Sequence, residues 1–242
     1  MKNYTFVGKG EVFIAPIGGN MRPIGNCDKV SLGFDEEVIE LKDFTKQGGG
    51  LANSLSRISK AQLNLNLFEF SPQNIALATF GQTRNELENT IHNERHVVES
   101  EGMIVLEKPF VSNVVIENMT DGTLYQEGKD YRMRSGSLFI PNTSSIPVGT
   151  EVEISYDHGQ TDVIEMLVSS GKEYRIYFEG LNEARSGKRS TLEIYRAKFN
   201  PASSIDMVGS EFGAIELNAN ILSDLTKTGD GISSFMKMNI EA

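Results

Sequence analysis

The stretch KAQLNLNLFEFSPQNIALATFG, residues 60–81, decides the fold of this 242-residue chain. Its first half alternates strictly between apolar and polar side chains, the period-two pattern of a strand with one buried and one exposed face. The exposed face is nearly uncharged because it is built from the amides Gln62, Asn64 and Asn66. The sequence therefore predicts a strand over Ser59–Glu69 with an amide-rich wet face.

A short helix is expected directly after this strand. Ser71 is a suitable N-cap, Pro72 fits the first helical position, and Phe70 can pack against Ile75. Gly81 is the expected C′ residue, since glycine readily adopts the left-handed conformation that ends many helices.

The segment before the strand has a different composition. Lys42–Arg57 contains three consecutive glycines and no apolar period, so it has no evident packing of its own. Loops of this length inside a domain are usually functional, or disordered until a partner binds them. We therefore expect a long polar loop here, and its three glycines lack the downstream residues of a phosphate-binding loop.

Short alternating segments with frequent glycine punctuation favour an all-β protein. In Ala214–Leu222, the polar residues Glu216, Asn218 and Asn220 alternate with apolar ones, which predicts a second strand with an amide-rich face and a surface shared with the first. The other strands expected in the same domain are Glu11–Pro16, Ser31–Leu41, Asp162–Val168, Glu173–Glu179 and Thr191–Phe199.

The chain divides by charge. Residues 86–160 hold 13 acidic and 5 basic residues, a net charge of −8, within a total of −10. We therefore predict an acidic β domain at 86–160, inserted between the two parts of a first domain at 1–85 and 161–242. Its expected strands are Val111–Ile116, Leu124–Tyr125, Ser137–Ile140 and Val152–Tyr156.

Several function classes find no support in the sequence. A net charge of −10 argues against tight binding of nucleic acid phosphates. The single cysteine, Cys27, excludes an internal disulfide framework, and no apolar run approaches the length of a membrane span. His92 and His96 are spaced for one helix face, but no third metal ligand is evident. No catalytic constellation is found, so we expect no enzyme, no cofactor and no metal.

Taken together, the chain resembles the major tail tube proteins of long-tailed bacteriophages. The resemblance is carried by loose patterns that cover most of the chain. They are Gly8–Pro16 with Pro23–Asn26, Glu36–Asp43 with the following glycines and Ser59–Gly81, Tyr174–Asn182 with Phe199–Pro201, and, in the inserted segment, Gly128–Tyr131, Gly136 and Gly149 before Val152–Tyr156.

The resemblance implies a mainly β protein: a β-sandwich or half-barrel tube domain with one short flanking helix, plus a small inserted β-sandwich of immunoglobulin-like type. It also implies six copies in a ring, with rings stacked into a hollow tube. The implied partners are other copies of the chain, the tape measure protein, the tail tip and terminator proteins, and double-stranded DNA that passes without specific binding. The implied location is the virion, after synthesis in the host cytoplasm.

Under this resemblance, two groups of residues gain roles. The first is a loop that stacks one ring on the next, and its candidates are Lys42, Lys46, Gly48, Gly49, Gly50 and Arg57. The second is the lining of the bore, where amides and scattered acids suit sliding DNA better than lysines do. Its candidates are Gln62, Asn64, Asn66, Glu216, Asn218 and Asn220, with Lys60 as an exception on the same face.

Two alternatives stay open at this point. A phage-derived or secretion-system tube protein would share the fold and the assembly and differ only in cargo. A carbohydrate-binding or adhesive two-domain β protein would suit the inserted segment, although the chain contains no Trp for sugar stacking.

Overall fold

The computed structural model describes residues 4–241 and divides the chain into two compact units. The main unit consists of the described residues up to Thr83 and from Ile164 onward, and the inserted unit is Arg84–Val163. The predicted insert, 86–160, lies within this second unit. Strands dominate both units, and α1 (Pro72–Ala78) is the one α-helix in the described part, so the prediction of a mainly β fold is confirmed.

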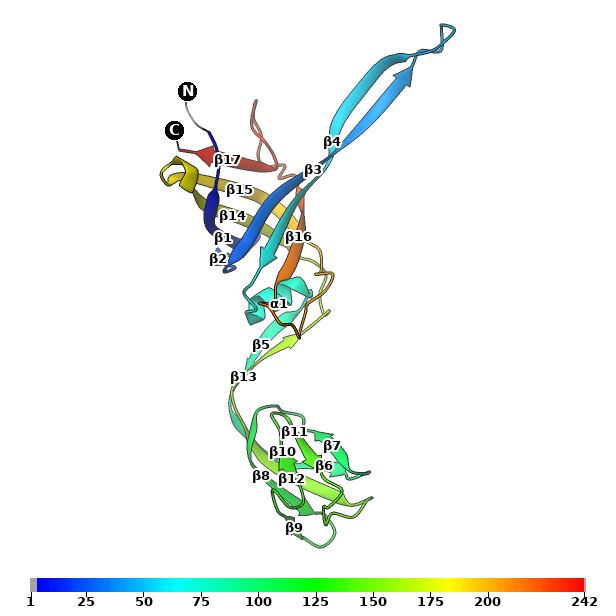
Figure 1. The fold of residues 1–242 in the computed structure, drawn as a ribbon, viewed down its shortest axis with the longest axis vertical. Helices are drawn as coiled ribbons and strands as arrows, with labels where there is room; N and C mark the ends of the chain where they lie inside the picture. Colours follow the sequence, from blue (N-terminus) through cyan, green and yellow to red (C-terminus); the bar gives the residue numbers. More distant parts are fainter. Residues whose placement is uncertain (1–3, 242) are drawn as a thin grey trace. The chain divides into compact units, whose positions relative to one another are not determined.

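The main unit is built on one eight-stranded sheet (Figure 1). The strand order is β2-β1-β14-β15-β16-β4-β3, and β17 pairs with the first half of β15. This order has two distinct ends, so the described strands form an open sheet. The strands are β1 (Gly8–Pro16), β2 (Arg22–Pro23), β3 (Cys27–Lys42), β4 (Leu51–Leu67), β14 (Glu173–Asn182), β15 (Lys188–Phe199), β16 (Ile215–Leu222) and β17 (Met236–Ile240), with a 3₁₀ turn at Glu183–Arg185.

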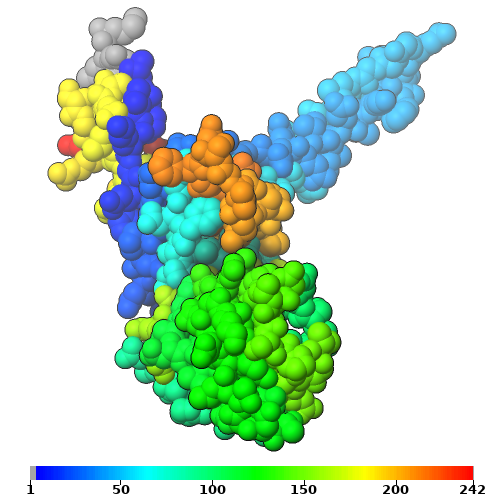
Figure 2. All heavy atoms as spheres, turned by 60° about the horizontal axis from the view of Figure 1, so that its bottom comes forward, coloured from blue at the N-terminus to red at the C-terminus, as the bar shows by residue number. Residues whose placement is uncertain are grey.

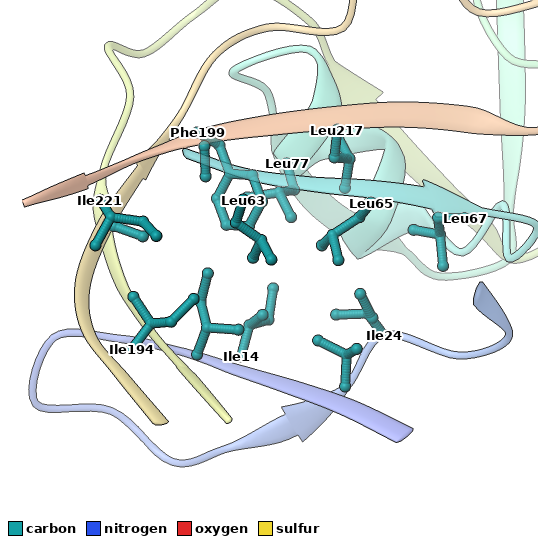
Figure 3. Packing of buried hydrophobic residues seen from close by; sticks show 14 of the residues in the cluster. Ile14, Ile24, Leu63, Leu65, Leu67, Leu77, Ile194, Phe199, Leu217 and Ile221 are labelled. Atoms are coloured by element: carbon teal, nitrogen blue, oxygen red, sulfur yellow. The ribbon is translucent and has the colours of Figure 1, made fainter. Parts of the chain in front are cut away.

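The core of the main unit lies on the concave side of this curved sheet (Figure 3). Leu63 and Leu65 of β4 and Leu217 of β16 are almost fully buried, as the alternation predicts. Ile14 from β1 and Ile194 from β15 pack against the same cluster from the other side. Each fully buried side chain of this size contributes roughly 1.5–3 kcal/mol. The apolar faces of β4 and β16 therefore hold the sheet in shape.

Helix α1 begins as the sequence predicts and ends one residue earlier. Ser71 caps it, with its Oγ accepting a hydrogen bond from Asn74 N at 3.3 Å, and Pro72 is the first helical residue. The left-handed C′ residue is Phe80, with φ 53°, so the assignment of Gly81 to this position is wrong. Gly81 N instead donates to Ala76 O at 2.7 Å. A side chain at Gly81 would lie 2.7 Å from Glu165 O, so the glycine serves a close backbone approach.

The predicted loop Lys42–Arg57 is largely wrong. β3 and β4 remain paired out to Lys42 opposite Leu51, and only residues 43–50 form the connection. All residues from Leu51 to Lys60 are exposed. Because neither face of the ribbon is buried there, the sequence shows no apolar alternation, and the strand pairing could not be read from it.

The inserted unit contains two sheets that share one core. The first has the order β6-β12-β8-β9, and the second has the order β10-β11-β7. Leu138 and Ile140 of the second sheet pack with Ile116, Val152 and Ile154 of the first, which makes a small sandwich. The strands are β6 (Asn89–Val97), β7 (Gly102–Val105), β8 (Val111–Asn118), β9 (Leu124–Tyr125), β10 (Arg132–Met133), β11 (Ser137–Ile140) and β12 (Glu151–His158).

The two connections between the units pair with each other. β5 (Gln82–Glu86) and β13 (Thr161–Glu165) form a two-stranded sheet. Asn85 donates through Nδ2 to Asp162 Oδ1 at 2.9 Å and accepts at Oδ1 from Gln160 Nε2 at 2.9 Å. The predicted strand Asp162–Val168 stops at Glu165 because Leu167 has a left-handed backbone, with φ 60°.

Candidate assembly surfaces

The six residues predicted to line a bore lie together on one face of the main sheet. β16 runs antiparallel beside β4, and their polar residues stand directly opposite one another. We call this group the amide face. Its cross-strand pairs are Gln62 with Asn220, Asn64 with Asn218, and Asn66 with Glu216.

Hydrogen bonds link these amides to one another and to their neighbours. Gln62 Nε2 donates to Asn220 Oδ1 at 3.5 Å, and Asn220 Nδ2 donates to Asn200 Oδ1 at 3.2 Å. At the other end of the face, Asn66 Nδ2 donates to Asp28 Oδ1 at 2.7 Å. Because each amide carries both a donor and an acceptor, these side chains bond to one another and to their neighbours and add no charge to the surface.

Charged residues border the amide face. Across β3, the residues opposite Asn64 and Gln62 are Ser31 and Gly33, which extends the neutral surface by one strand. Lys60, the exception noted in the sequence, stands opposite Asp35. Opposite charges on facing positions of a strand pair offset each other. The surface is therefore neutral at its centre and carries mixed charge at its rim.

The second candidate surface is a hairpin arm, which we define as residues 36–58. It extends beyond the core as a two-stranded ribbon (Figures 1 and 2). Arg57 Nε and Glu37 Oε2 form an ion pair of 2.9 Å across its base. Lys42 ends its first strand, and Lys46 lies in the connection, as do the glycines 48–50, all of which have positive φ. The predicted loop residues thus lie along the arm and its tip.

The hairpin arm exposes apolar side chains on both faces. Ile39 and Leu55 stand opposite each other and are 47% and 60% exposed. Val38 and Ile58 are exposed on the other face, and Phe44 is exposed near the tip. An isolated two-stranded hairpin is only marginally stable in water. These side chains therefore favour a binding partner along the arm.

The arm also carries an open sheet edge. β3 is the last strand of the order, so one side of its backbone has no neighbouring strand among the described residues. Such an edge is a template for pairing with another chain. Open edge and exposed apolar surface occur on the same strand.

The inserted unit contains a hydrogen-bond network centred on Glu94. Tyr156 donates its hydroxyl to Glu94 Oε2, His96 Nε2 lies 2.7 Å from Glu94 Oε1, and the backbone N of Glu107 donates to Oε1 at 3.0 Å. Burial disfavours the ionised carboxyl, but these hydrogen bonds outweigh that effect and lower the pKa of Glu94. Burial and the bond to Glu94 raise the pKa of Tyr156. The network fixes β6 on β12.

The histidine pattern does not describe a helix. His92 and His96 lie in strand β6, and Asn93 between them has a left-handed backbone, with φ 57°, where the register with β12 shifts. Glu94 and Arg95 between the two histidines pair with Ile154 and Glu153 of β12. Within residues 4–241, no three His, Cys, Asp or Glu side chains are arranged to hold a metal ion.

Sequence reasoning missed two exposed apolar features of the main unit. One is a groove between the first described residues, the start of β15, and β17. The other is the loop between β15 and β16, where Val208 and Phe212 are 95% and 94% exposed. Neither the residues that line the groove nor those of the loop follow a periodic apolar pattern, so the sequence indicates neither feature.

Comparison with known proteins identifies the family of the chain. A family model described as "Protein of unknown function UCP028589" matches residues 5–239, so the chain belongs to this family. No curated protein matches it. Among the described residues, no helix has the length and apolar character needed to cross a membrane.

Proposed function

We propose that this member of the family is a structural subunit that assembles into stacked hexameric rings, which form the hollow tail tube of a long-tailed bacteriophage. The observation that carries the proposal is the pairing of a neutral amide face with an adjacent edge strand that extends into an apolar arm. The hexameric count comes from the resemblance to tail tube proteins. The proposal assigns the chain no catalytic role.

In this proposal the amide face lines the bore. DNA phosphates are held by Lys and Arg, and each such contact adds to affinity through counterion release. A lining of Gln and Asn offers no such contact and also limits repulsion, since Glu216 is its one acid. DNA can then slide through the tube during ejection without specific binding.

The hairpin arm then connects successive rings. A contact that joins two different surfaces of identical subunits can repeat without limit. The arm offers apolar side chains on both faces, and a neighbouring ring would cover them. Lys42, Lys46, the glycines 48–50 and Arg57 lie on the stacking element in this arrangement. The tape measure protein and the tip and terminator proteins are the further partners in the virion.

The inserted unit lies outside the bore in this proposal. Its two connections leave the main unit side by side, so the main sheet does not depend on it. Removing residues 86–160 and closing the gap should leave tubes intact. Loss of all tubes in a variant that still folds would contradict an external, dispensable position.

Negative-stain electron microscopy of the concentrated protein tests the proposal most directly. We expect rings or hollow tubes from the full chain. A variant in which the hairpin arm, residues 36–58, is replaced by a short turn after Asp35 should form rings that do not stack. Protein that stays monomeric over time at high concentration, with and without added tail tip complex, would refute the tube assignment.

A charge change on the amide face tests the bore. Asn64 is flanked by Ser31 and Asn218, so Asn64→Lys together with Asn218→Lys places new cations on a neutral surface. We expect normal tubes and slow DNA release. The matched control is Asn142→Lys, at an exposed position of the inserted unit, which should release DNA at the normal rate. Equal release rates for both variants would show that the amide face does not line the bore.

A further inference from the structure

A groove of about 580 Å³ in the main unit, which we call the terminal groove, lies between the first described residues, the start of β15 and the end of β17. Its apolar lining comes from Tyr4, Phe6, Met238 and Ile240, which are all more than half exposed. Monomeric proteins seldom leave such side chains gathered around one hollow without a function.

One lining residue lacks a hydrogen-bond partner. Ser190 in β15 is 4% exposed, and its Oγ makes no hydrogen bond, the only such buried side-chain atom found in the described part of the chain. A buried hydroxyl without a partner costs free energy. Ser190 therefore offers a desolvated donor to whatever occupies the groove.

The rim of the groove is basic. Arg185 lies over the ring of Tyr4, with Cζ 4.9 Å from its centroid, and Lys188 and Arg189 also line the groove. The carboxylate in the lining, Glu241, accepts a hydrogen bond from the backbone N of Arg189 at 2.9 Å. The groove therefore fits a ligand with exposed apolar groups and negative charge.

The same chain exposes a segment with this chemistry. The acidic loop, which we define as Asp206–Phe212, contains two acids and no basic residue. Among the described large apolar side chains, Val208 and Phe212 are the most exposed. The hairpin tip is a poorer match, because Lys42 and Lys46 outnumber the single acid Asp43 and would be repelled by the basic rim.

The acidic loop cannot reach the groove of its own subunit. The groove lies at the start of β15, at Ser190, whereas the segment that leads to the loop leaves the other end of this strand after Phe199. These two positions are about 30 Å apart along the strand. Ala202 N donates to Ala78 O at 2.7 Å, which holds the start of the loop on α1. In Figure 1 the end of the unit with β17 and the end with α1 lie opposite each other.

We infer that the acidic loop of one copy docks in the terminal groove of a second copy. Val208 and Phe212 enter the apolar lining, Glu211 pairs with Arg189, and a backbone carbonyl of the loop accepts a hydrogen bond from the Ser190 hydroxyl. The contact joins two different surfaces head to tail, so it can close a ring or propagate along a tube. The inference deepens the proposed tube function and supplies one of its subunit contacts.

A peptide of residues 201–214, labelled with fluorescein, tests the contact on the full-length protein at a concentration below assembly. We expect saturable binding by fluorescence anisotropy, weakened at least tenfold by Arg185→Glu with Arg189→Glu. Ser190→Ala should also weaken binding without lowering the melting temperature. The matched control is Lys129→Glu, an exposed position of the inserted unit, which should bind normally. No saturable binding, or equal binding by all variants, would overturn the inference.

Charge exchange provides a second test. Glu211→Arg and Arg189→Glu should each reduce self-association, and a chain carrying both should recover it. Recovery by the double variant supports the pairing, and additive loss overturns it. The two proposals can fail separately. Wild-type tubes without peptide binding would refute only the docking of the acidic loop. Peptide binding without wild-type rings or tubes would refute only the tube function.

Discussion

Strand β4 contains two leucines that should separate folding from assembly. Leu63 is 1% exposed in the core, whereas Leu55 is 60% exposed on the hairpin arm. We predict that Leu63→Ala lowers the free energy of unfolding of the free subunit by about 2–5 kcal/mol, as core truncations do. Leu55→Ala should change it by no more than about 1 kcal/mol, because most of this side chain is exposed and its cross-strand pair with Ile39 contributes only about 0.2–1 kcal/mol.

Assembly should reverse the order of the two effects. Full burial of a leucine contributes roughly 1.5–3 kcal/mol. The 60% of Leu55 that is still exposed is the part that a neighbouring ring can cover, which gives about 1–2 kcal/mol per contact. Since 1.4 kcal/mol corresponds to tenfold in an equilibrium constant, Leu55→Ala should weaken subunit association by roughly 5- to 30-fold.

Two measurements distinguish these effects. Urea unfolding followed by circular dichroism gives the stability of the free subunit, and light scattering gives the lowest concentration at which tubes form. Leu63→Ala should assemble near the normal concentration under conditions where it is folded. The reasoning fails if Leu55→Ala destabilises the free subunit as much as Leu63→Ala does, or if it assembles at the wild-type concentration.

Three further predictions concern individual side chains. Folding lowers the pKa of Glu94, so its ionised form stabilises the inserted unit above pH 4.5, and this stability is lost as the pH falls through the folded pKa. Glu94→Gln should therefore make the free energy of unfolding less dependent on pH in the acid range. Burial, with a smaller effect of Asp28, raises the pKa of Cys27 from 9.0 to about 11, so iodoacetamide at pH 8 should react about a hundredfold more slowly than with the urea-unfolded chain, and equal rates would contradict this. Asp130→Ala should cost about 2–4 kcal/mol in urea unfolding, because the carboxylate accepts from the backbone and hydroxyl of Ser145, and a loss below 0.5 kcal/mol would show that water replaces it.

The sequence predicts strands with one buried face most completely, although it also predicts Ser31–Leu41, which lies in β3 and has no fully buried residue. In the second half of β4 and in β16 the alternation of buried apolar residues with polar ones is complete, so both strands could be predicted from it. The first half of β4 and most of β6 have no fully buried face, and their pairing depends on backbone hydrogen bonds that leave no pattern in side chains. Burial, more than strand formation itself, leaves a signal in the sequence.

The candidate surfaces follow the same division. The amides of β4 and β16 could be predicted to share a face, because each strand has an apolar side that must turn inward. The sequence could not indicate that the two strands are neighbours or that Asn64 stands directly opposite Asn218. Both facts depend on the strand register and on a connection that runs through more than half of the chain. The terminal groove draws on three segments far apart in the sequence, so no local pattern could indicate it.

The paired connections β5 and β13 have a consequence for engineering. Adjacent antiparallel strands lie about 5 Å apart, so the chain leaves the main unit and returns to it at almost one point. A foreign module whose own ends are neighbours can be spliced there without stretching the host backbone. The site therefore suits the insertion of a foreign domain, which each subunit would display once.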